Sequence, residues 1–267
     1  MNALTNPKIL RVVNIVALIV TLIVNGLSNS SLFPRTMAEI GNARPLFFLP
    51  AAYVFAVWGV IYTLLIGFLI YSFRPIAQEK RSVEKVGIWF LVSCVANSIW
   101  LIFFLYDQLW LSTVAMLVLL ASLVSIYLRL EIGKRAVDWQ EDWAVLMPFR
   151  VYLGWISVAT VANFTAALYD SGATTAWLGI GSDIWAVLMM AVAGVLAFLM
   201  LARRNDVAFA LVVIWALVGI NLRPFNTEMY QVLSALNAGL VDTGALVVAG
   251  IVAVGIAWQT FTSRRVA

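Results

Sequence analysis

The chain has 267 residues, of which 63% are hydrophobic and 11% charged, and its formal net charge is +4. Soluble domains carry about 25% charged residues, so a buried core does not account for this composition, whereas a surrounding bilayer does. Histidine is absent and cysteine occurs once, at Cys94, which excludes an internal disulfide and the usual His/Cys metal sites and leaves no visible basis for enzymatic catalysis.

Eight apolar stretches fill the chain, and each is long enough, or nearly so, to cross a hydrocarbon layer of about 30 Å as a helix. The apolar runs are continuous and do not alternate with polar residues, which favours helices over strands. In chain order the predicted spans cover residues 12–32, 50–73, 86–106, 109–130, 144–169, 184–202, 207–222 and 232–261. The sequence therefore predicts an all-α integral membrane protein with eight transmembrane helices. The first span is expected to be retained, because no A-x-A-like cleavage site follows it.

The basic residues are divided unequally between the connections. Both termini and every second connection, counted with the adjoining span ends that carry Arg129 and Arg150, hold 14 of the 17 lysines and arginines, and the remaining connections hold only Arg35, Arg44 and Arg223. Basic residues accumulate on the cytoplasmic side of membrane proteins. We therefore expect both termini to be cytoplasmic. The same distribution argues against nucleic acid as a partner.

Two connections on the opposite side have distinct lengths. Residues 107–108 leave room only for a tight turn, so the third and fourth spans should form an antiparallel hairpin. Residues 33–49 form a long connection that contains Gly41, Arg44 and Pro45. A long loop at the mouth of a helix bundle is either the lid or wall of a site or a plain connector.

Three predicted helices carry aromatic residues at helical spacing, and two of these faces include an asparagine. The residues are Phe55, Trp58 and Tyr62 in the second span, Asn97, Trp100 and Phe104 in the third, and Tyr152, Trp155 and Asn163 in the fifth. An asparagine that faces lipid is costly, so it normally points inward to a hydrogen-bond partner. The three faces are therefore either helix-packing seams or the lining of a cavity in which the amides orient a flat hydrophobic ligand.

One carboxylate, Asp242, lies about ten residues into the last apolar run. A carboxylate at that depth is a functional candidate. Alternatively, the span begins later and Asp242 lies at the membrane interface. Arg223 is the nearest cation by topology, and the two form a candidate buried charge pair.

Three segments resemble signatures of the TspO/MBR family, which comprises the tryptophan-rich sensory proteins and the mitochondrial translocator protein. Residues 50–62 resemble the second-helix signature of that family, and Asn97 to Trp100 resemble its third-helix Asn-x-x-Trp motif. Tyr152 to Trp155, followed by Asn163, are similar to its fifth-helix motif. The signatures occur in the family's order, and the resemblance covers roughly residues 8–170.

The resemblance implies a five-helix membrane core over residues 1–170, with a ligand cavity that opens toward the long first loop. Residues 171–267 would add three helices, as in a longer bacterial branch of the family, and the resemblance to that branch implies a location in a bacterial inner membrane. Family members bind tetrapyrroles, and the mitochondrial branch binds cholesterol and benzodiazepine-type drugs. By resemblance, the cavity would be lined or supported by Phe55, Trp58, Asn97, Trp100, Trp155 and Asn163. The first-loop tryptophan of the family is missing from residues 44–50, which argues against porphyrin breakdown.

We therefore expect a non-enzymatic membrane receptor, sensor or carrier for a flat hydrophobic ligand, with a porphyrin or other tetrapyrrole as the candidate. The alternative is an accessory structural subunit of a larger membrane complex, such as a photosynthetic or respiratory assembly. Expected partners are the lipid bilayer, a hydrophobic small molecule or pigment, and a second copy of the chain or a larger complex. Glycines in the extension, such as Gly194 and Gly219, would let helices approach closely, either within the chain or against another protein.

Overall fold

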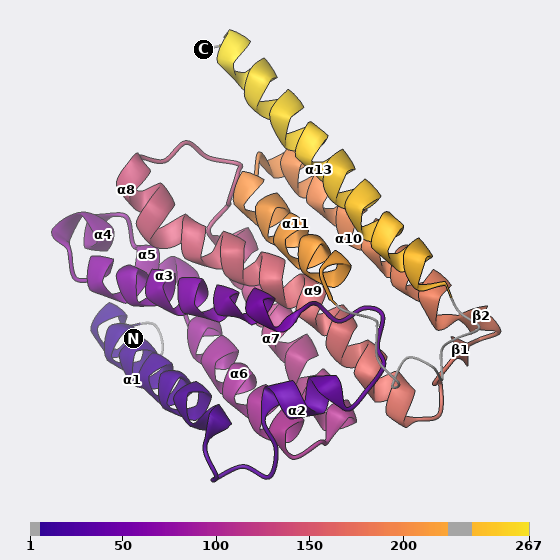
Figure 1. Cartoon of the computed structure of the whole chain (residues 1–267). Coiled ribbons are helices and arrows are strands. Elements are labelled where there is room, and N and C mark those ends of the chain that lie inside the picture. The colour runs from indigo at the N-terminus through magenta and orange to yellow at the C-terminus, as the bar shows by residue number, and fades with distance from the viewer. Residues whose placement is uncertain (1–5, 224–236, 267) are drawn as a thin grey trace. The chain divides into compact units, whose positions relative to one another are not determined.

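The computed structural model describes residues 6–266 except 224–236, and it is mainly helical (Figure 1). Its residue contacts define two compact units. The first unit comprises residues 1–37 and 56–156, and the second comprises residues 38–55 and 157–267. This division differs from the expected boundary at residue 170, because the long loop and the second half of the fifth span belong to the same unit as the C-terminal helices.

Six described segments are long and apolar enough to cross a membrane. They are Pro7–Asn29, Ala52–Tyr71, Leu109–Arg129, Trp139–Asp170, Ser182–Arg204 and Ala238–Thr262. Two shorter apolar helices occupy Trp89–Leu105 and Val207–Asn221. Each of the eight predicted spans overlaps one of these segments, which confirms the helical membrane architecture, whereas eight crossings stay a prediction. Residues 232–236 of the predicted eighth span lie outside the described residues.

The first unit is built on four long helices and the first half of a fifth. These are α1 (Pro7–Gly26), α3 (Val57–Tyr71), α6 (Trp89–Leu105), α7 (Leu109–Arg129) and α9 (Met147–Asp170). Short helical segments between them are η2 (Leu27–Asn29), α4 (Pro75–Glu79), α5 (Ser82–Val86), α8 (Trp139–Glu141) and the π-helical η4 (Asp142–Leu146). The third span starts three residues later than predicted because Gly87, at φ 61°, interrupts the helix between α5 and α6. The π-helical turn precedes Pro148, which lacks the N–H for a regular helical bond.

The predicted hairpin of the third and fourth spans is present. Asp107 adopts a positive φ of 60°, and the Gln108 N–H donates to the Phe103 carbonyl oxygen over 2.8 Å. Aspartate tolerates this left-handed conformation better than most residues. At the same end of the unit, Arg35 forms an ion pair with Asp107, with 2.7 Å between Nη1 and Oδ2.

A charge cluster joins two basic-rich connections of the first unit. The Lys80 ammonium contacts the Asp138 carboxylate and lies 3.0 Å from Oε2 of Glu141, which also pairs with Arg135. Residues 74–85 and 131–138 therefore lie at the same end of this unit, as the charge distribution predicts. The hydrogen bond from Lys80 lowers the pKa of Asp138, and the same bond raises the pKa of Lys80.

The lowered pKa of Asp138 makes a pH-dependent contribution to stability. Its carboxylate stabilises the folded protein above the unfolded-state pKa of about 3.9, and this stabilisation is lost as the pH falls through the lower folded-state pKa. We expect Asp138→Asn to flatten the melting-temperature profile below about pH 4 by a small amount, because the pair is exposed. The amide still accepts the helix-capping bond from the Glu141 N–H. An Asp138→Asn profile as steep as that of the parent would contradict this account.

The second unit combines the long loop with the C-terminal helices. Its elements are α2 (Met37–Asn42), η3 (Ala52–Ala56), the second half of α9, β1 (Ala176–Trp177), β2 (Ile180–Gly181), α10 (Ser182–Arg204), α11 (Val207–Asn221) and α13 (Ala238–Val266). The two strands form a small antiparallel hairpin in which Ala176 lies opposite Gly181. Helices α10 and α13 run side by side (Figure 1). A Cβ on Gly194 of α10 would lie 2.5 Å from Val248 of α13, so this glycine serves packing within the chain.

The segment before α3 packs on α11 at a second glycine. The Ala51 N–H donates to the Gly219 carbonyl oxygen over 2.8 Å, and the Trp215 indole N–H donates to the Val54 carbonyl oxygen over 3.1 Å. The ring of Tyr53 meets the ring of Trp215 edge-on at 5.2 Å. Residues 51–54 are therefore held to α11 by backbone and side-chain contacts together.

Candidate functional site

The aromatic residues predicted on three helices of the first unit lie together around Trp58. The Trp58 ring stacks on Tyr62 from its own helix, with 5.5 Å between the ring centroids and an interplanar angle of 20°. It also stacks on Trp100 from α6, with a centroid distance of 5.8 Å and an interplanar angle of 27°. Trp100 in turn contacts Phe104 at 5.9 Å. Trp58 is thus stacked against one aromatic ring of its own helix and one of α6, the kind of contact that flat ring systems also make.

The edges of the same tryptophan are fixed by α9. Tyr152 and Trp155 approach the Trp58 ring at 5.8 Å and 6.3 Å, with interplanar angles of 72° and 84°. Trp100, Tyr152 and Trp155 are buried, whereas Trp58 is half-buried. The near-perpendicular contacts restrict rotation of the Trp58 ring, so the stack is held in one orientation.

A chain of hydrogen bonds fixes the amide of Asn97 beside these rings. Asn97 is fully buried, and its Nδ2 donates to the Tyr152 hydroxyl oxygen over 2.9 Å. The Nδ2 of Asn25 on α1 donates to Oδ1 of Asn97 over 3.0 Å and to the Thr21 carbonyl oxygen over 2.9 Å. Thr21 donates to the Cys94 carbonyl oxygen on α6 over 3.1 Å. Three helices are therefore joined through polar groups inside an apolar bundle.

Asn25 and Thr21 are functional candidates that the sequence reasoning missed. The signal was available, because an asparagine near the end of an apolar span has the same reason to point inward as Asn97. Its partner was not readable from the sequence, since Asn25 and Asn97 lie in different spans and neither belongs to a spacing pattern that includes the other.

Two predicted site residues belong to the second unit. Phe55 is half-buried in η3, and Asn163 is buried in the second half of α9. The structure therefore brings together Trp58, Tyr62, Asn97, Trp100, Phe104, Tyr152 and Trp155 in the first unit, whereas Phe55 and Asn163 belong to the second unit.

The expected charge pair of Asp242 and Arg223 does not form among the described residues. The Arg223 guanidinium donates to the carbonyl oxygens of Leu49 and Gly41 over 3.3 and 3.4 Å. Oδ1 of Asp242 is buried without a hydrogen-bond partner in the described part of the chain, and its backbone carbonyl accepts from Asn221. Arg223 therefore holds the long loop instead. Helix α13 begins at Ala238 and not at residue 232, so Asp242 lies near its start. This later start agrees with the alternative interpretation of the last span.

The comparisons with known proteins agree with the sequence signatures. A family model described as TSPO-like protein matches residues 11–258 of the chain. The match continues past residue 170 and includes α10, α11 and most of α13, so these helices are part of the family pattern. No curated protein and no solved structure gives a significant match. Across residues 6–223 and 237–266, no cluster of three or more His, Cys, Asp or Glu side chains is arranged to hold a metal ion.

Proposed function

This chain belongs to the TSPO-like protein family, and we propose that it is a non-enzymatic membrane receptor, sensor or carrier for a flat hydrophobic ligand. A tetrapyrrole is the proposed ligand class, in line with the sequence resemblance. The charge distribution supports placing both termini in the cytoplasm, with the chain in a bacterial inner membrane.

The observation that carries the proposal is the stack of Tyr62, Trp58 and Trp100. Aromatic ring systems prefer offset-stacked or edge-on contacts at 4.5–7 Å between centroids, and all the Trp58 contacts lie in that range. A planar macrocycle that joins such a stack buries one of its faces against a protein ring whose orientation is already fixed. The amide of Asn97, fixed on both sides, adds a positioned polar group next to the rings, as sites for small apolar ligands commonly have.

Porphyrin titration of the purified protein in lipid nanodiscs tests this function. Protoporphyrin IX should shift its Soret band saturably on binding. We expect Trp58→Leu to weaken binding about two- to tenfold, because the loss of an aromatic stacking contact is worth about 0.5–1.5 kcal/mol beyond area. Trp258→Leu is the matched control, since Trp258 lies on α13 and is 69% exposed; it should leave the affinity unchanged.

If Trp58→Leu, Trp100→Leu and Trp155→Leu each bind porphyrin with the affinity of the parent protein, the aromatic faces serve helix packing and not ligand binding. The rival function, an accessory subunit of a larger membrane complex, would instead be supported by a stoichiometric partner that co-purifies in mild detergent while the isolated chain shows no Soret shift. The two functions therefore give opposite results in the same preparation.

A further inference from the structure

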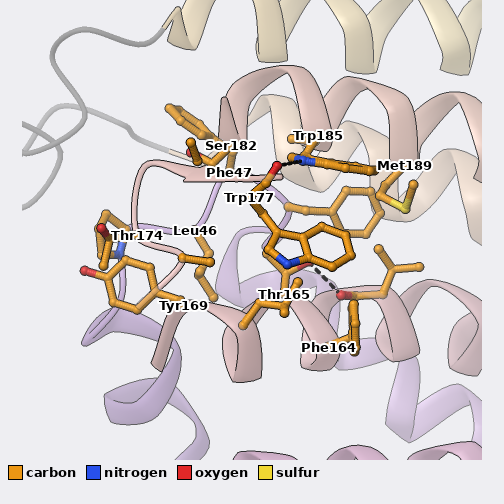
Figure 2. A pocket seen from close by; sticks show the side chains of 17 residues that line it. Leu46, Phe47, Phe164, Thr165, Tyr169, Thr174, Trp177, Ser182, Trp185 and Met189 are labelled. Carbon is orange, nitrogen blue, oxygen red and sulfur yellow. Dashed lines mark hydrogen bonds between the residues drawn. The ribbon is translucent and has the colours of Figure 1, made fainter. Parts of the chain in front are cut away.

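The second unit contains a cavity of about 280 Å³ whose described lining residues all belong to that unit (Figure 2). Its walls come from residues 45–48 of the long loop, the end of α9, the β1–β2 hairpin and the start of α10. Figure 2 shows Trp177 of the hairpin between Phe164 of α9 and Trp185 of α10. The ring of Trp177 contacts Trp185 at 5.1 Å and Phe164 at 6.3 Å, so aromatic rings from three elements form one wall.

The polar groups of this wall are largely engaged within the protein. The Trp185 indole N–H donates to the Trp177 carbonyl oxygen over 2.9 Å, and Thr165 Oγ1 donates to the Val161 carbonyl oxygen over 2.8 Å (Figure 2). Oγ of Ser182, which also lines the cavity, is buried and has no hydrogen-bond partner among the described residues. A ligand would therefore meet mainly apolar and aromatic surface, with the buried Ser182 hydroxyl available as a hydrogen-bond partner.

Helix α9 lines the cavity with one of its faces. The cavity uses Val161, Phe164, Thr165 and Leu168, which follow the i, i+3, i+4, i+7 pattern of a single helix face. These residues belong to the second unit, whereas Trp58 and the rings around it belong to the first.

The wall contributed by the long loop is fastened by a bidentate ion pair. Nε and Nη2 of Arg44 donate to the two carboxylate oxygens of Asp170 over 2.7 and 2.6 Å. Nη1 of the same residue donates to the Ile40 carbonyl oxygen over 3.1 Å. Because the wall residues 45–48 follow Arg44 directly, this pair fixes the loop wall of the cavity to the end of α9.

We propose that this cavity is a second binding site, for a compact, neutral, planar aromatic molecule with one hydrogen-bonding group. The described residues of the lining include no charged side chain, and an unpaired charge buried there would be costly, so the ligand is neutral. At about 280 Å³ the cavity lies just below the range of about 300–1,000 Å³ for small-molecule sites, which suits one or two fused or linked rings rather than a four-ring macrocycle. The aromatic wall favours a planar ring, and Ser182 supplies its polar partner.

Photoaffinity labelling of the full chain in nanodiscs with 4-hydroxybenzophenone tests the site. On irradiation the carbonyl of the probe abstracts a hydrogen atom from a nearby C–H group, and the two carbon radicals join. The Met189 side chain lines the cavity and is a favourable target for this reaction. We expect peptide mass spectrometry to find saturable adducts on Met189 and its cavity neighbours. An excess of 2-naphthol, a neutral planar aromatic molecule with one hydroxyl group and no photoreactive carbonyl, should suppress them.

Two variants on the same helix distinguish labelling inside the cavity from nonspecific labelling by probe dissolved in the lipid. Ala186→Phe fills the cavity, because Ala186 is buried and lines it, whereas Ala191→Phe places the same ring on an exposed position of α10. We expect the first to abolish saturable labelling and the second to leave it intact. If Ala186→Phe does not fold, Thr174→Trp narrows the cavity from the turn before the hairpin.

Ser182→Ala tests the polar contact. It should weaken competition by 2-naphthol about two- to tenfold, the value of one hydrogen bond, and leave competition by naphthalene, which has no hydrogen-bonding group, unaffected. Labelling that never saturates, or that persists in both cavity-filling variants, would overturn the proposal. Porphyrin binding is measured independently. Ala186→Phe should keep the Soret shift and Trp58→Leu should keep the photolabel, so the proposal for one site can be contradicted while the proposal for the other stands.

Discussion

Replacing Gly219 with alanine is expected to destabilise the protein by about 2–3 kcal/mol, a large effect for one methyl group. A Cβ at this position would lie 2.1 Å from Cγ2 of Val54 and 3.1 Å from Cβ of Pro50. Alanine favours the helix over glycine by up to about 1 kcal/mol. The energetic cost of an overlap of this size is larger, so the net change in the free energy of unfolding is destabilising.

The neighbours of Gly219 have little freedom to move away. Val54 is fully buried, and its carbonyl oxygen accepts from the Trp215 indole. The Ala51 N–H is bonded to the carbonyl of Gly219 itself. Relief of the clash therefore requires that residues 51–54 separate from α11 and give up both hydrogen bonds.

The test uses a matched glycine and a double variant. Gly250 lies in α13, where an added Cβ would have no neighbouring atom within 4 Å, so Gly250→Ala should be neutral or slightly stabilising in thermal unfolding. Val54→Ala removes the clashing methyl groups, and Gly219→Ala combined with Val54→Ala should recover most of the loss caused by the first substitution. A Gly219→Ala protein that melts like Gly250→Ala would contradict the packing of this segment on α11.

The parts of the fold that were predictable from sequence are those that depend on local chemistry. Continuous apolar runs located the membrane helices, and the spacing of Trp58, Trp100 and Tyr152 indicated faces that the structure brings together. A bilayer favours helices in apolar segments and favours polar side chains that point inward. The helix and its inward face can therefore both be predicted from the sequence of a single span.

The missed features depend on partners that leave no sequence pattern. Arg223 donates to backbone carbonyls of the long loop rather than to Asp242, and every residue has a carbonyl, so no residue type marks the acceptor. The hairpin that carries Trp177 turns through Leu178 and Gly179, both at positive φ; a glycine alone does not specify that a connection becomes a cavity wall. The unit boundary within α9 likewise follows from tertiary contacts, not from composition.

Asp170→Asn is the second substitution with a large expected effect, a loss of about 2–3 kcal/mol. Removing one partner of a buried ion pair costs about 3–5 kcal/mol because the other charge stays buried. The Arg44 side chain is 7% exposed and that of Asp170 is 36% exposed, so solvent near the carboxylate reduces the figure. Asparagine retains one acceptor oxygen but neither the charge nor the bidentate geometry.

An exposed ion pair of similar length serves as the control for burial. Arg35 and Asp107 are 2.7 Å apart, with side chains that are 48% and 29% exposed. Exposed pairs contribute about 0–1 kcal/mol, so Arg35→Gln should hardly change the melting temperature. A loss in Arg35→Gln equal to that in Asp170→Asn would show that burial of Arg44 does not govern the effect.

A double-mutant cycle completes the Asp170 prediction. Arg44→Gln with Asp170→Asn should cost less than the two single losses added together, because no buried charge is then left without its partner. The loop wall of the cavity should loosen whenever the pair is broken, so 4-hydroxybenzophenone labelling of Met189 should fall in both single variants and in the double variant. Stability losses that simply add would mean that Arg44 and Asp170 act independently. Labelling that persists in all three would mean that residues 45–48 keep their place without the ion pair, through their own apolar contacts.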